Sequence, residues 1–438
     1  MIKPLSTPKK ATAREAAASR DGKRSAAGDG GDSPDFLGTN AKYKNRAEKI
    51  DSDTGEILGI VNPMASRVQR FILQSVARKF LPKSRTNNCL RLRASHKPIW
   101  SATYIPQTIK IWQSKEHKTT FFTGLQTCGS VWACPVCSAK IAERRRAEII
   151  AAMAAHNAAG GCVHMLTLTA PHQRGDDLAE LLANQAKALN SFWNDRHVKA
   201  VLWEMGTVGQ IRALEVTHGR KSAHNNGWHP HYHVLLFNGL EPHLMRYDSL
   251  RLEQMTEWML RLYAVWARVC VKAGLGEPSL QHGLKLDDGS HAAKYVSKWG
   301  LEDEMTKGHT KKSIHGETPF DFLRAYVEDH NDKQAGALFK EFAETFKGKR
   351  QLHWSSGLKK RYAIGDKSDA EISEEKDDFA TLLGPITFDQ WCDILAVEGR
   401  GAVQSLAASG GFLALTSYLE SIKGSRHKNK TRCFLVTT

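Results

Sequence analysis

One group of residues whose types and spacing could do chemistry is a set of clustered cysteines. Three of them lie within ten residues of one another: Cys128, Cys134 and Cys137. The Cys-x-x-Cys half of this group is the usual zinc knuckle, because it brings two thiolates to one ion. A structural Zn²⁺ site needs a fourth ligand, and Cys89 is the best upstream candidate, ahead of His96 and His117. The alternatives are a set of small buried hydrophobic residues or a redox pair.

A second group combines two histidines with a carboxylate. On a strand, residues two apart share a face, so His231 and His233 would present two imidazoles side by side. Neutral imidazoles suit first-row divalent metals. Glu215 lies in an apolar run just upstream, where a carboxylate costs stability unless it has a partner. A site of two histidines and one carboxylate leaves coordination positions open, as catalysis requires. The alternative is a pair of surface histidines with ordinary hydrogen bonds.

The third group is Tyr295 with Lys298, which would share a face of a helix predicted over 290–299. A tyrosine hydroxyl, with an ordinary pKa of about 10, is a poor nucleophile at neutral pH. A nearby ammonium group or metal site favours the phenolate. Taken alone, the pair favours the ordinary interpretation, a half-buried aromatic residue beside a solvated charge.

Alternating strands and helices are expected to position these residues. Strands are predicted at 108–113, 119–123, 163–169, 210–217, 229–237 and 279–286. Helices are predicted from Ser138, a candidate N-cap, to the stop at Gly160-Gly161, after Asp176-Asp177, and over 252–272, 290–299 and 319–346. This interleaving favours an α+β fold in which helices pack on a sheet.

Composition and charge narrow the class of partner. The chain has 438 residues, with 62 Lys and Arg against 46 Asp and Glu, and a formal net charge of +16. This favours a polyanionic partner, nucleic acid first. The composition excludes a wholly disordered or collagen-like chain. The sequence has neither a secretory signal nor an apolar run long enough to span a bilayer, so we expect a cytoplasmic protein without a membrane partner.

A basic stretch from 61 to 100 contains no acidic residue. One-signed charge over that distance repels itself unless a counter-charge such as a phosphate backbone is present. Arg67, Arg70 and Arg91 are therefore candidate DNA contacts, with a solvated basic face as the alternative.

Taken together, the motifs resemble the bacterial rolling-circle plasmid replication initiators (Rep proteins) of the HUH endonuclease superfamily. The segment from Leu166 to Pro171 is similar to the first motif of the family, and His231-Tyr232-His233 to its His-hydrophobic-His motif. Tyr295-Val296-Ser297-Lys298 is similar to its Tyr-x-x-Lys motif, and the segment from Cys128 to Cys137 is typical of this plasmid group. The match runs in order from about Cys128 to Lys298, with a weaker similarity to about Leu358.

The resemblance implies a fold and a mechanism. The family fold carries the histidines on a central antiparallel sheet with flanking helices and the tyrosine on a facing helix. In the family, Mg²⁺ or Mn²⁺ held by the histidines polarises a phosphodiester of single-stranded origin DNA. The tyrosine becomes linked to the 5′ end, and the released 3′-hydroxyl primes a host polymerase, with a host helicase as a further implied partner. Lys298 would help to place the phosphate or assist Tyr295.

The predicted organisation has four parts: a disordered basic segment (1–60), a basic cysteine-rich zinc and DNA-binding region (61–160), an HUH endonuclease core (161–300), and a helical C-terminal region with a loose basic tail (301–438). One position departs from the family. Some relatives have a glutamate one turn before the tyrosine that activates water for termination, and this chain has His291 there.

Three alternative functions are compatible with parts of the sequence. A zinc-containing nucleic-acid-binding protein without catalysis would need neither Tyr295 nor the paired histidines. A transposase or relaxase of the HUH superfamily more often has paired tyrosines or an appended helicase, and this chain has no Walker-type phosphate loop. A metal-dependent hydrolase would use His231 and His233 but would form no covalent adduct with DNA.

Overall fold

The computed structural model describes most of the chain after residue 46. The described residues are 47–50, 57–61, 63–95, 106–115, 118–222, 225–239, 249–288, 316–376 and 379–429. The strands are β1 (Ala47–Ile50), β2 (Ile57–Val61), β3 (Ile109–Gln113), β4 (Thr120–Thr123), β5 (Cys162–Thr169), β6 (Thr207–His218), β7 (Trp228–Asn238), β8 (Leu284–Asp288), β9 (Leu352–Trp354) and β10 (Thr381–Ile386).

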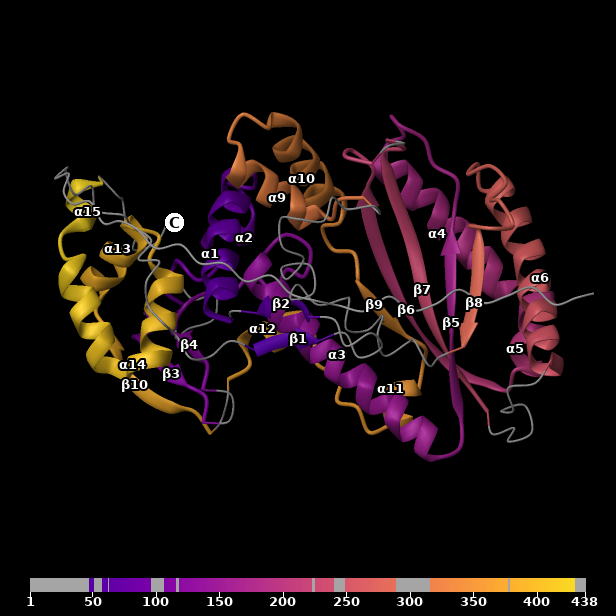
Figure 1. The fold of residues 1–438 in the computed structure, drawn as a ribbon, viewed down its shortest axis with the longest axis horizontal. Helices are drawn as coiled ribbons and strands as arrows, with labels where there is room; N and C mark the ends of the chain where they lie inside the picture. The colour runs from indigo at the N-terminus through magenta and orange to yellow at the C-terminus, as the bar shows by residue number, and fades with distance from the viewer. Residues whose placement is uncertain are drawn as a thin grey trace, which may run out of the picture. The chain divides into compact units, whose positions relative to one another are not determined.

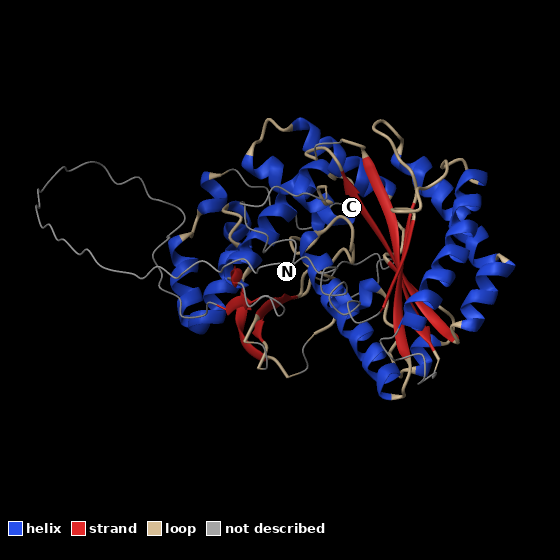
Figure 2. Ribbon diagram, turned by 45° about the vertical axis from the view of Figure 1, so that its right-hand side comes forward, coloured by secondary structure: helices blue, strands red, loops and turns tan. Residues whose placement is uncertain are grey.

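Helices connect and cover these strands (Figures 1 and 2). They are α1 (Pro63–Phe80), α2 (Arg85–Asn88), α3 (Pro135–Ala158), α4 (Leu178–Asn194), α5 (Arg196–Glu204), α6 (Ser249–Lys272), α9 (Pro319–Glu328), α10 (Lys333–Thr345), α11 (Leu358–Arg361), α12 (Asp369–Glu374), α13 (Phe388–Ala396), α14 (Arg400–Ser421) and α15 (Ser425–Lys428).

The central sheet has five strands in the order β8-β5-β7-β6-β9, and every neighbouring pair is antiparallel. Its register places Thr167 opposite His233 and Glu215 opposite His231. The expected α+β fold, with helices packed on an antiparallel sheet, is confirmed.

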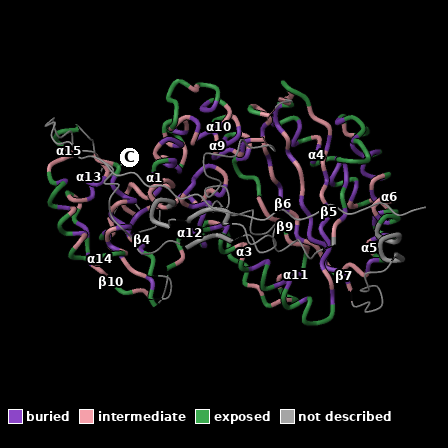
Figure 3. Tube along the Cα trace, in the orientation of Figure 1, coloured by how far each residue is buried: buried purple, intermediate pink, exposed green. Residues whose placement is uncertain are grey.

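The two faces of this sheet bury different residues, because side chains alternate along each strand. One face carries Leu166, Val234 and Leu236, which join the largest core with residues of α4 and α6. The other face carries Met165 and Leu235, which pack with residues of α3. Figure 3 shows the buried residues concentrated along these strands. The side chains of His231 and His233 belong to this second face, further along β7, by the same alternation.

A second sheet, in the order β10-β3-β4, joins segments far apart in the chain. Strand β10 pairs with β3 in antiparallel register, with Ile386 opposite Ile109. Around this sheet, a separate core contains Phe71 of α1, Trp391 of α13 and residues of α14. Residues between 71 and 125 and residues between 386 and 422 therefore build one hydrophobic core together.

Several predicted boundaries need correction. Helix α3 begins at Pro135 and not at Ser138, because Cys134 is the N-cap and Pro occupies the first turn. The predicted helix over 319–346 is two helices, since Asp332 caps a new one. The strand predicted at 279–286 begins later, at Leu284. The predicted helix over 290–299 lies outside the described residues.

The predicted organisation also differs from the structure at its edges. Part of the segment 1–60, expected to be disordered, forms an antiparallel hairpin of β1 and β2. The central sheet extends past the expected boundary at residue 300, because β9 pairs with β6. The C-terminal region is likewise not only helical, since it supplies β9 and β10. Within the described part of the chain, no helix is both long and apolar enough to cross a membrane.

Candidate metal centres

The first candidate centre is the histidine–glutamate cluster, formed by Glu215 of β6 with His231 and His233 of β7. The ligand atoms of the three side chains all lie within 4.8 Å of one another. The Nε2 atom of His231 lies 3.4 Å from Oε2 of Glu215, and that of His233 lies 3.6 Å from the same oxygen. The structure thus brings together the three residues that the sequence analysis predicted as metal ligands.

The other ring nitrogens of these histidines are held by neighbours. Nδ1 of His233 lies 3.0 Å from the hydroxyl of Thr167, and Nδ1 of His231 lies 3.2 Å from the carbonyl oxygen of His229. If Nδ1 carries the proton and donates it to these oxygens, the lone pair of each Nε2 faces Glu215. Such partners fix the orientation of metal-binding histidines and raise their basicity. The donor set, with His233 only 7% exposed, therefore fits a divalent cation.

The strand ends that carry the cluster are anchored from the opposite face of the sheet. The side-chain amide of Gln185 in α4 donates a hydrogen bond of 2.6 Å to the carbonyl oxygen of Pro230. The indole of Trp266 in α6 donates one of 2.9 Å to the carbonyl oxygen of Thr169. The large apolar core under the sheet thus holds the backbone of β7 at the cluster and that of β5 beside it, where Thr169 lies opposite His231.

Two further histidines extend the cluster into a row. The ring of His229 stacks on that of His172, with centroids 4.5 Å apart, and on that of His231 at 4.9 Å. Burial, followed by the nearby charges of His231, His172 and His233, lowers the pKa of His229 to about 3. Burial also lowers the pKa of His172. His229 is therefore a neutral ring that packs against a candidate ligand.

The buried His229 should make stability depend on pH. The unfolded chain binds a proton at His229 near pH 6.5, whereas the folded protein does so only near pH 3. The contribution of His229 to the free energy of unfolding is therefore lost as the pH falls below about 6.5, by up to about 1.4 kcal/mol per pH unit. The variant His229→Gln should lack this part of the slope in urea unfolding between pH 5 and 7.5.

The matched control for that measurement is His282→Gln, which removes an exposed histidine. This control should keep the slope of the wild type. If the difference in the free energy of unfolding between the wild type and His229→Gln stays constant with pH, the prediction is contradicted.

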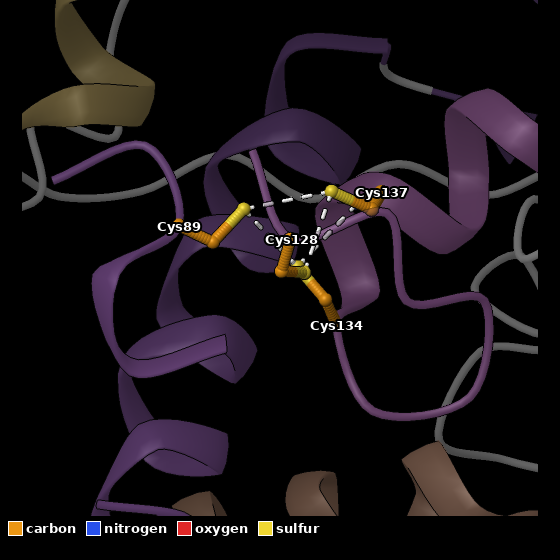
Figure 4. Close-up of side chains that lie close together, drawn as sticks. All are labelled: Cys89, Cys128, Cys134 and Cys137. Carbon is orange, nitrogen blue, oxygen red and sulfur yellow. Dashed lines mark hydrogen bonds between the residues drawn. The ribbon is translucent and has the colours of Figure 1, made fainter. Parts of the chain in front are cut away.

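The second candidate centre is the four-cysteine cluster, formed by Cys89, Cys128, Cys134 and Cys137 (Figure 4). All four side chains are buried. The Sγ atom of Cys137 lies 3.5 Å from that of Cys89 and 3.7 Å from that of Cys128, and Cys89 lies 3.8 Å from Cys134. Four sulfurs around a tetrahedral Zn²⁺, at Zn–S distances of about 2.3 Å, lie about 3.8 Å apart. The cluster therefore has the spacing of a closed tetrahedral sulfur site.

Hydrogen bonds supply partial positive charge to the sulfurs. The backbone N–H of Cys137 donates to Sγ of Cys134, and the side-chain amide of Gln74 in α1 donates to the same sulfur at 3.1 Å. Burial disfavours the Cys134 thiolate, but hydrogen bonds from Cys128, Cys137 and Cys89 outweigh it and hold the pKa of Cys134 well below its usual value. A thiolate is the form that binds metal.

The remaining predicted site residues lie in two places. Tyr295, Lys298 and His291 lie outside the described residues. Arg67 is half-buried on α1, where burial and the charge of Arg70 lower its pKa. The side chain of Arg91 is only 9% exposed and pairs with Glu398, with Nη2 2.7 Å from Oε1. Arg91 is thereby held in an ion pair with a partly exposed carboxylate, and its expected contact with DNA stays a prediction.

Some residues around these centres were missed by sequence reasoning. His229 could have been found, because it lies two residues before His231 and so shares its face of the strand. The contact of Gln74 with Cys134 joins residues sixty positions apart and has no local signal. The hydroxyl of Thr167 lies in a motif that the sequence already singled out, but its contact with His233 depends on the register of β5 and β7.

Comparisons with known proteins show which proteins this chain is similar to. Residues 121–265 match the family model described as a replication protein. This range contains three of the four cysteines and the whole histidine–glutamate cluster, and it ends before Tyr295. These matches, with those below, support a plasmid replication initiator, the class that the motifs resemble.

Two proteins with curated names are similar in sequence to this chain. The protein named Protein rep, from Streptomyces lividans, is 25% identical over 315 residues, which cover 58% of this chain and 68% of the relative. A protein from Streptomyces cyanogenus named Neomycin resistance protein is 31% identical over 140 residues, which cover 26% of this chain and 31% of the relative. No solved structure matches the chain.

Proposed function

We propose that this protein initiates rolling-circle replication of a plasmid by nicking and rejoining one strand at the origin. The observation that carries the proposal is the convergence of Glu215, His231 and His233 on one face of an antiparallel sheet, within the range that matches the replication protein family. The histidine–glutamate cluster provides a divalent cation site, and Tyr295 provides the nucleophile. Origin DNA is the substrate, and a host helicase and polymerase act after the nick.

The histidine–glutamate cluster would hold Mg²⁺ or Mn²⁺ through the Nε2 atoms and one carboxylate oxygen. When bound, the cation would polarise the scissile phosphodiester and stabilise the leaving oxygen. The residues of the chain do the rest. Hydrogen bonds with Thr167 and with the backbone carbonyl of His229 fix the orientation of the imidazole rings of His233 and His231. The neutral ring of His229 fills the space beside His231, which limits its rotation.

Tyr295 would attack the phosphorus in line. Its hydroxyl oxygen forms a bond to phosphorus as the bond to the 3′ oxygen breaks, so the 5′ phosphate becomes linked to the protein and the 3′-hydroxyl leaves. The phosphotyrosine keeps the bond energy, so that a later 3′-hydroxyl can reverse the step and close the circle. Lys298, three residues after Tyr295 in the sequence, would hold the phosphate or favour the phenolate.

The four-cysteine cluster would hold a structural Zn²⁺, because four buried thiolates at tetrahedral spacing match that ion. Two half-buried cations on α1, Arg67 and Arg70, are proposed to contact the DNA backbone. Their mutual repulsion would be relieved by a phosphate, and binding would release counterions.

The test of this function is adduct formation by the wild-type protein on single-stranded origin DNA. The protein, incubated with Mn²⁺, should give a slower, nuclease-sensitive band on a denaturing protein gel, and none with EDTA. Mass spectrometry of the digested band should place the nucleotide on the peptide that contains Tyr295. Cleavage without a band would favour a hydrolase that uses water. Tight binding without cleavage would favour a DNA-binding protein without catalysis.

Removing the carboxylate should weaken the cation site. In Glu215→Gln, one anionic ligand becomes neutral while the shape of the side chain is kept, so the dissociation constant for Mn²⁺ should rise by at least about tenfold. Isothermal titration calorimetry of the protein with MnCl₂ measures this dissociation constant. Glu204→Gln is the matched control, because Glu204 pairs with Arg261 and is not part of the cluster. Equal affinities in the two variants would exclude Glu215 as a ligand.

A further inference from the structure

Arg400, the first residue of α14, is fully buried beside the four-cysteine cluster. Its side chain is 0% exposed, and burial lowers its pKa to about 9. The guanidinium also lies over the ring of Phe71, 4.9 Å from its centre. A buried cation is destabilising unless it is paired and hydrogen-bonded, so its presence needs an explanation.

The hydrogen bonds of Arg400 lead to the cysteines by a short path. Its Nη1 donates to Oε1 of Gln74 at 2.5 Å. The amide nitrogen of the same Gln74, which is 1% exposed, donates to Sγ of Cys134 at 3.1 Å. Because one amide accepts from the cation and donates to the sulfur, the dipole of Gln74 points its positive end at Cys134.

A second contact reaches the other side of the cluster. Nη1 of Arg400 also lies 3.3 Å from the carbonyl oxygen of Leu90, the residue after Cys89. The nearby carboxylate of Glu398 is shared with Arg91, which binds both of its oxygens, at 2.7 and 3.0 Å. Nη2 of Arg400 also lies 3.3 Å from Oε2 of Glu398. Two guanidinium groups thus share one carboxylate, so the three side chains together keep one net positive charge beside the cysteines.

The backbone is shaped to let Arg400 reach this position. The next residue, Gly401, lies against α1 so closely that an added Cβ would be 2.7 Å from the Cα of Val68. Any larger residue would push the first turn of α14 away from α1. Since α1 also carries Gln74, this close approach sets the distance between Arg400 and the amide.

We propose that Arg400, acting through Gln74, is a positioning and charge-balancing residue of the four-cysteine centre, so that metal binding and the packing of α14 on α1 stabilise each other. The inference rests on the proposed Zn²⁺ at the cluster. A divalent ion held by four thiolates carries an excess of about two negative charges, which a buried site must offset. Arg400 supplies a cation for this purpose, and it lies more than 260 residues after Cys137, the last cysteine of the cluster.

The test is the affinity of the full-length protein for Zn²⁺, measured by competition with a chromophoric chelator. Arg400→Met removes the cation. Gln74→Glu keeps an acceptor for Arg400 but replaces the N–H donor with a carboxylate next to the sulfur. Each should raise the Zn²⁺ dissociation constant by about 10- to 100-fold, the range seen when partners of metal ligands are removed. In addition, Zn²⁺ removal should increase the cleavage of α14 by a protease in the wild type.

Val403→Ala is the control for general destabilisation, because Val403 is fully buried in the same helix and belongs to the separate core around the second sheet. It should lower the melting temperature without changing the Zn²⁺ dissociation constant by more than about twofold. If both variants bind Zn²⁺ as tightly as Val403→Ala, the role of Arg400 and Gln74 is refuted while the zinc site stands. A wild-type protein without stoichiometric Zn²⁺ would refute the zinc site itself. If Arg400→Met does not fold, Gln74→Glu decides the matter alone.

Discussion

Tyr295→Phe should abolish the covalent protein–DNA adduct and lower the cleavage of single-stranded origin DNA by on the order of 10³-fold or more. The substitution removes one oxygen and keeps the aromatic ring, so the side chain loses only the proposed attacking atom. Cation binding at the histidine–glutamate cluster should not change, since the variant keeps the three proposed ligands Glu215, His231 and His233. The measurement is a denaturing gel of reactions with Mn²⁺, together with the rate at which the labelled DNA is cut.

Tyr232→Phe is the matched control for this experiment. Tyr232 lies between the two histidines in the chain, but on the opposite face of β7, and burial raises its pKa. A buried phenol that keeps its proton cannot serve as the nucleophile, so this variant should form the adduct. An adduct that survives in Tyr295→Phe would assign the nucleophile elsewhere, and undiminished cleavage without an adduct would point to attack by water.

Cys134→Ser should remove stoichiometric Zn²⁺ and destabilise the protein by several kcal/mol. Structural Zn²⁺ in small domains contributes about 10–16 kcal/mol of apparent binding free energy at neutral pH, although the loss here is limited by the surrounding cores. Cys134 also caps α3 and receives the hydrogen bond from Gln74, so the start of the helix should loosen as well. Metal content by mass spectrometry and the melting temperature measure the two effects.

Cys270→Ser separates loss of metal from loss of a buried thiol. Cys270 is buried in α6, and burial raises its pKa to about 12, so it behaves as a small apolar side chain. Its replacement by serine should cost about 1–3 kcal/mol for the buried hydroxyl and leave the Zn²⁺ content unchanged. If the two variants lose the same amounts of metal and stability, the four-cysteine cluster is not a zinc site.

Local patterns made much of the candidate site predictable. The two-residue spacing of His231 and His233 and the apolar run around Glu215 required adjacent strands, and β6 and β7 pair directly. The Cys-x-x-Cys spacing likewise placed two sulfurs together. The distance of 39 residues between Cys89 and Cys128 follows no spacing rule for zinc ligands, and the structure brings Cys89 into the cluster.

Long-range pairing could not be predicted in the same way. Strand β9 has only three residues, too few to show a period, and it joins the sheet from far along the chain. The pairing of β10 with β3 could not be predicted from the sequence either. The alternation of apolar and polar residues indicates a strand, but it does not specify which other strand it pairs with. Arg400 looks like an ordinary surface arginine in the sequence, and only the packing of α14 on α1 reveals that it is buried.

The pairing of β10 with β3 has a consequence for synthesis on the ribosome. The central sheet lies wholly between the two strands in the chain, so its segments emerge before β10 is made. Some 270 residues are therefore translated after β3 before the ribosome synthesises β10 and the helices that pack against the apolar side of α1 around Phe71. In that interval β3 can pair with β4 but exposes its other edge, and α1 exposes an apolar surface. Unpaired strand edges and exposed apolar surface are the features that recruit chaperones or lead to aggregation. The proposed enzyme therefore completes the core around its second sheet only near the end of translation, after the sheet that carries the histidine–glutamate cluster has been synthesised.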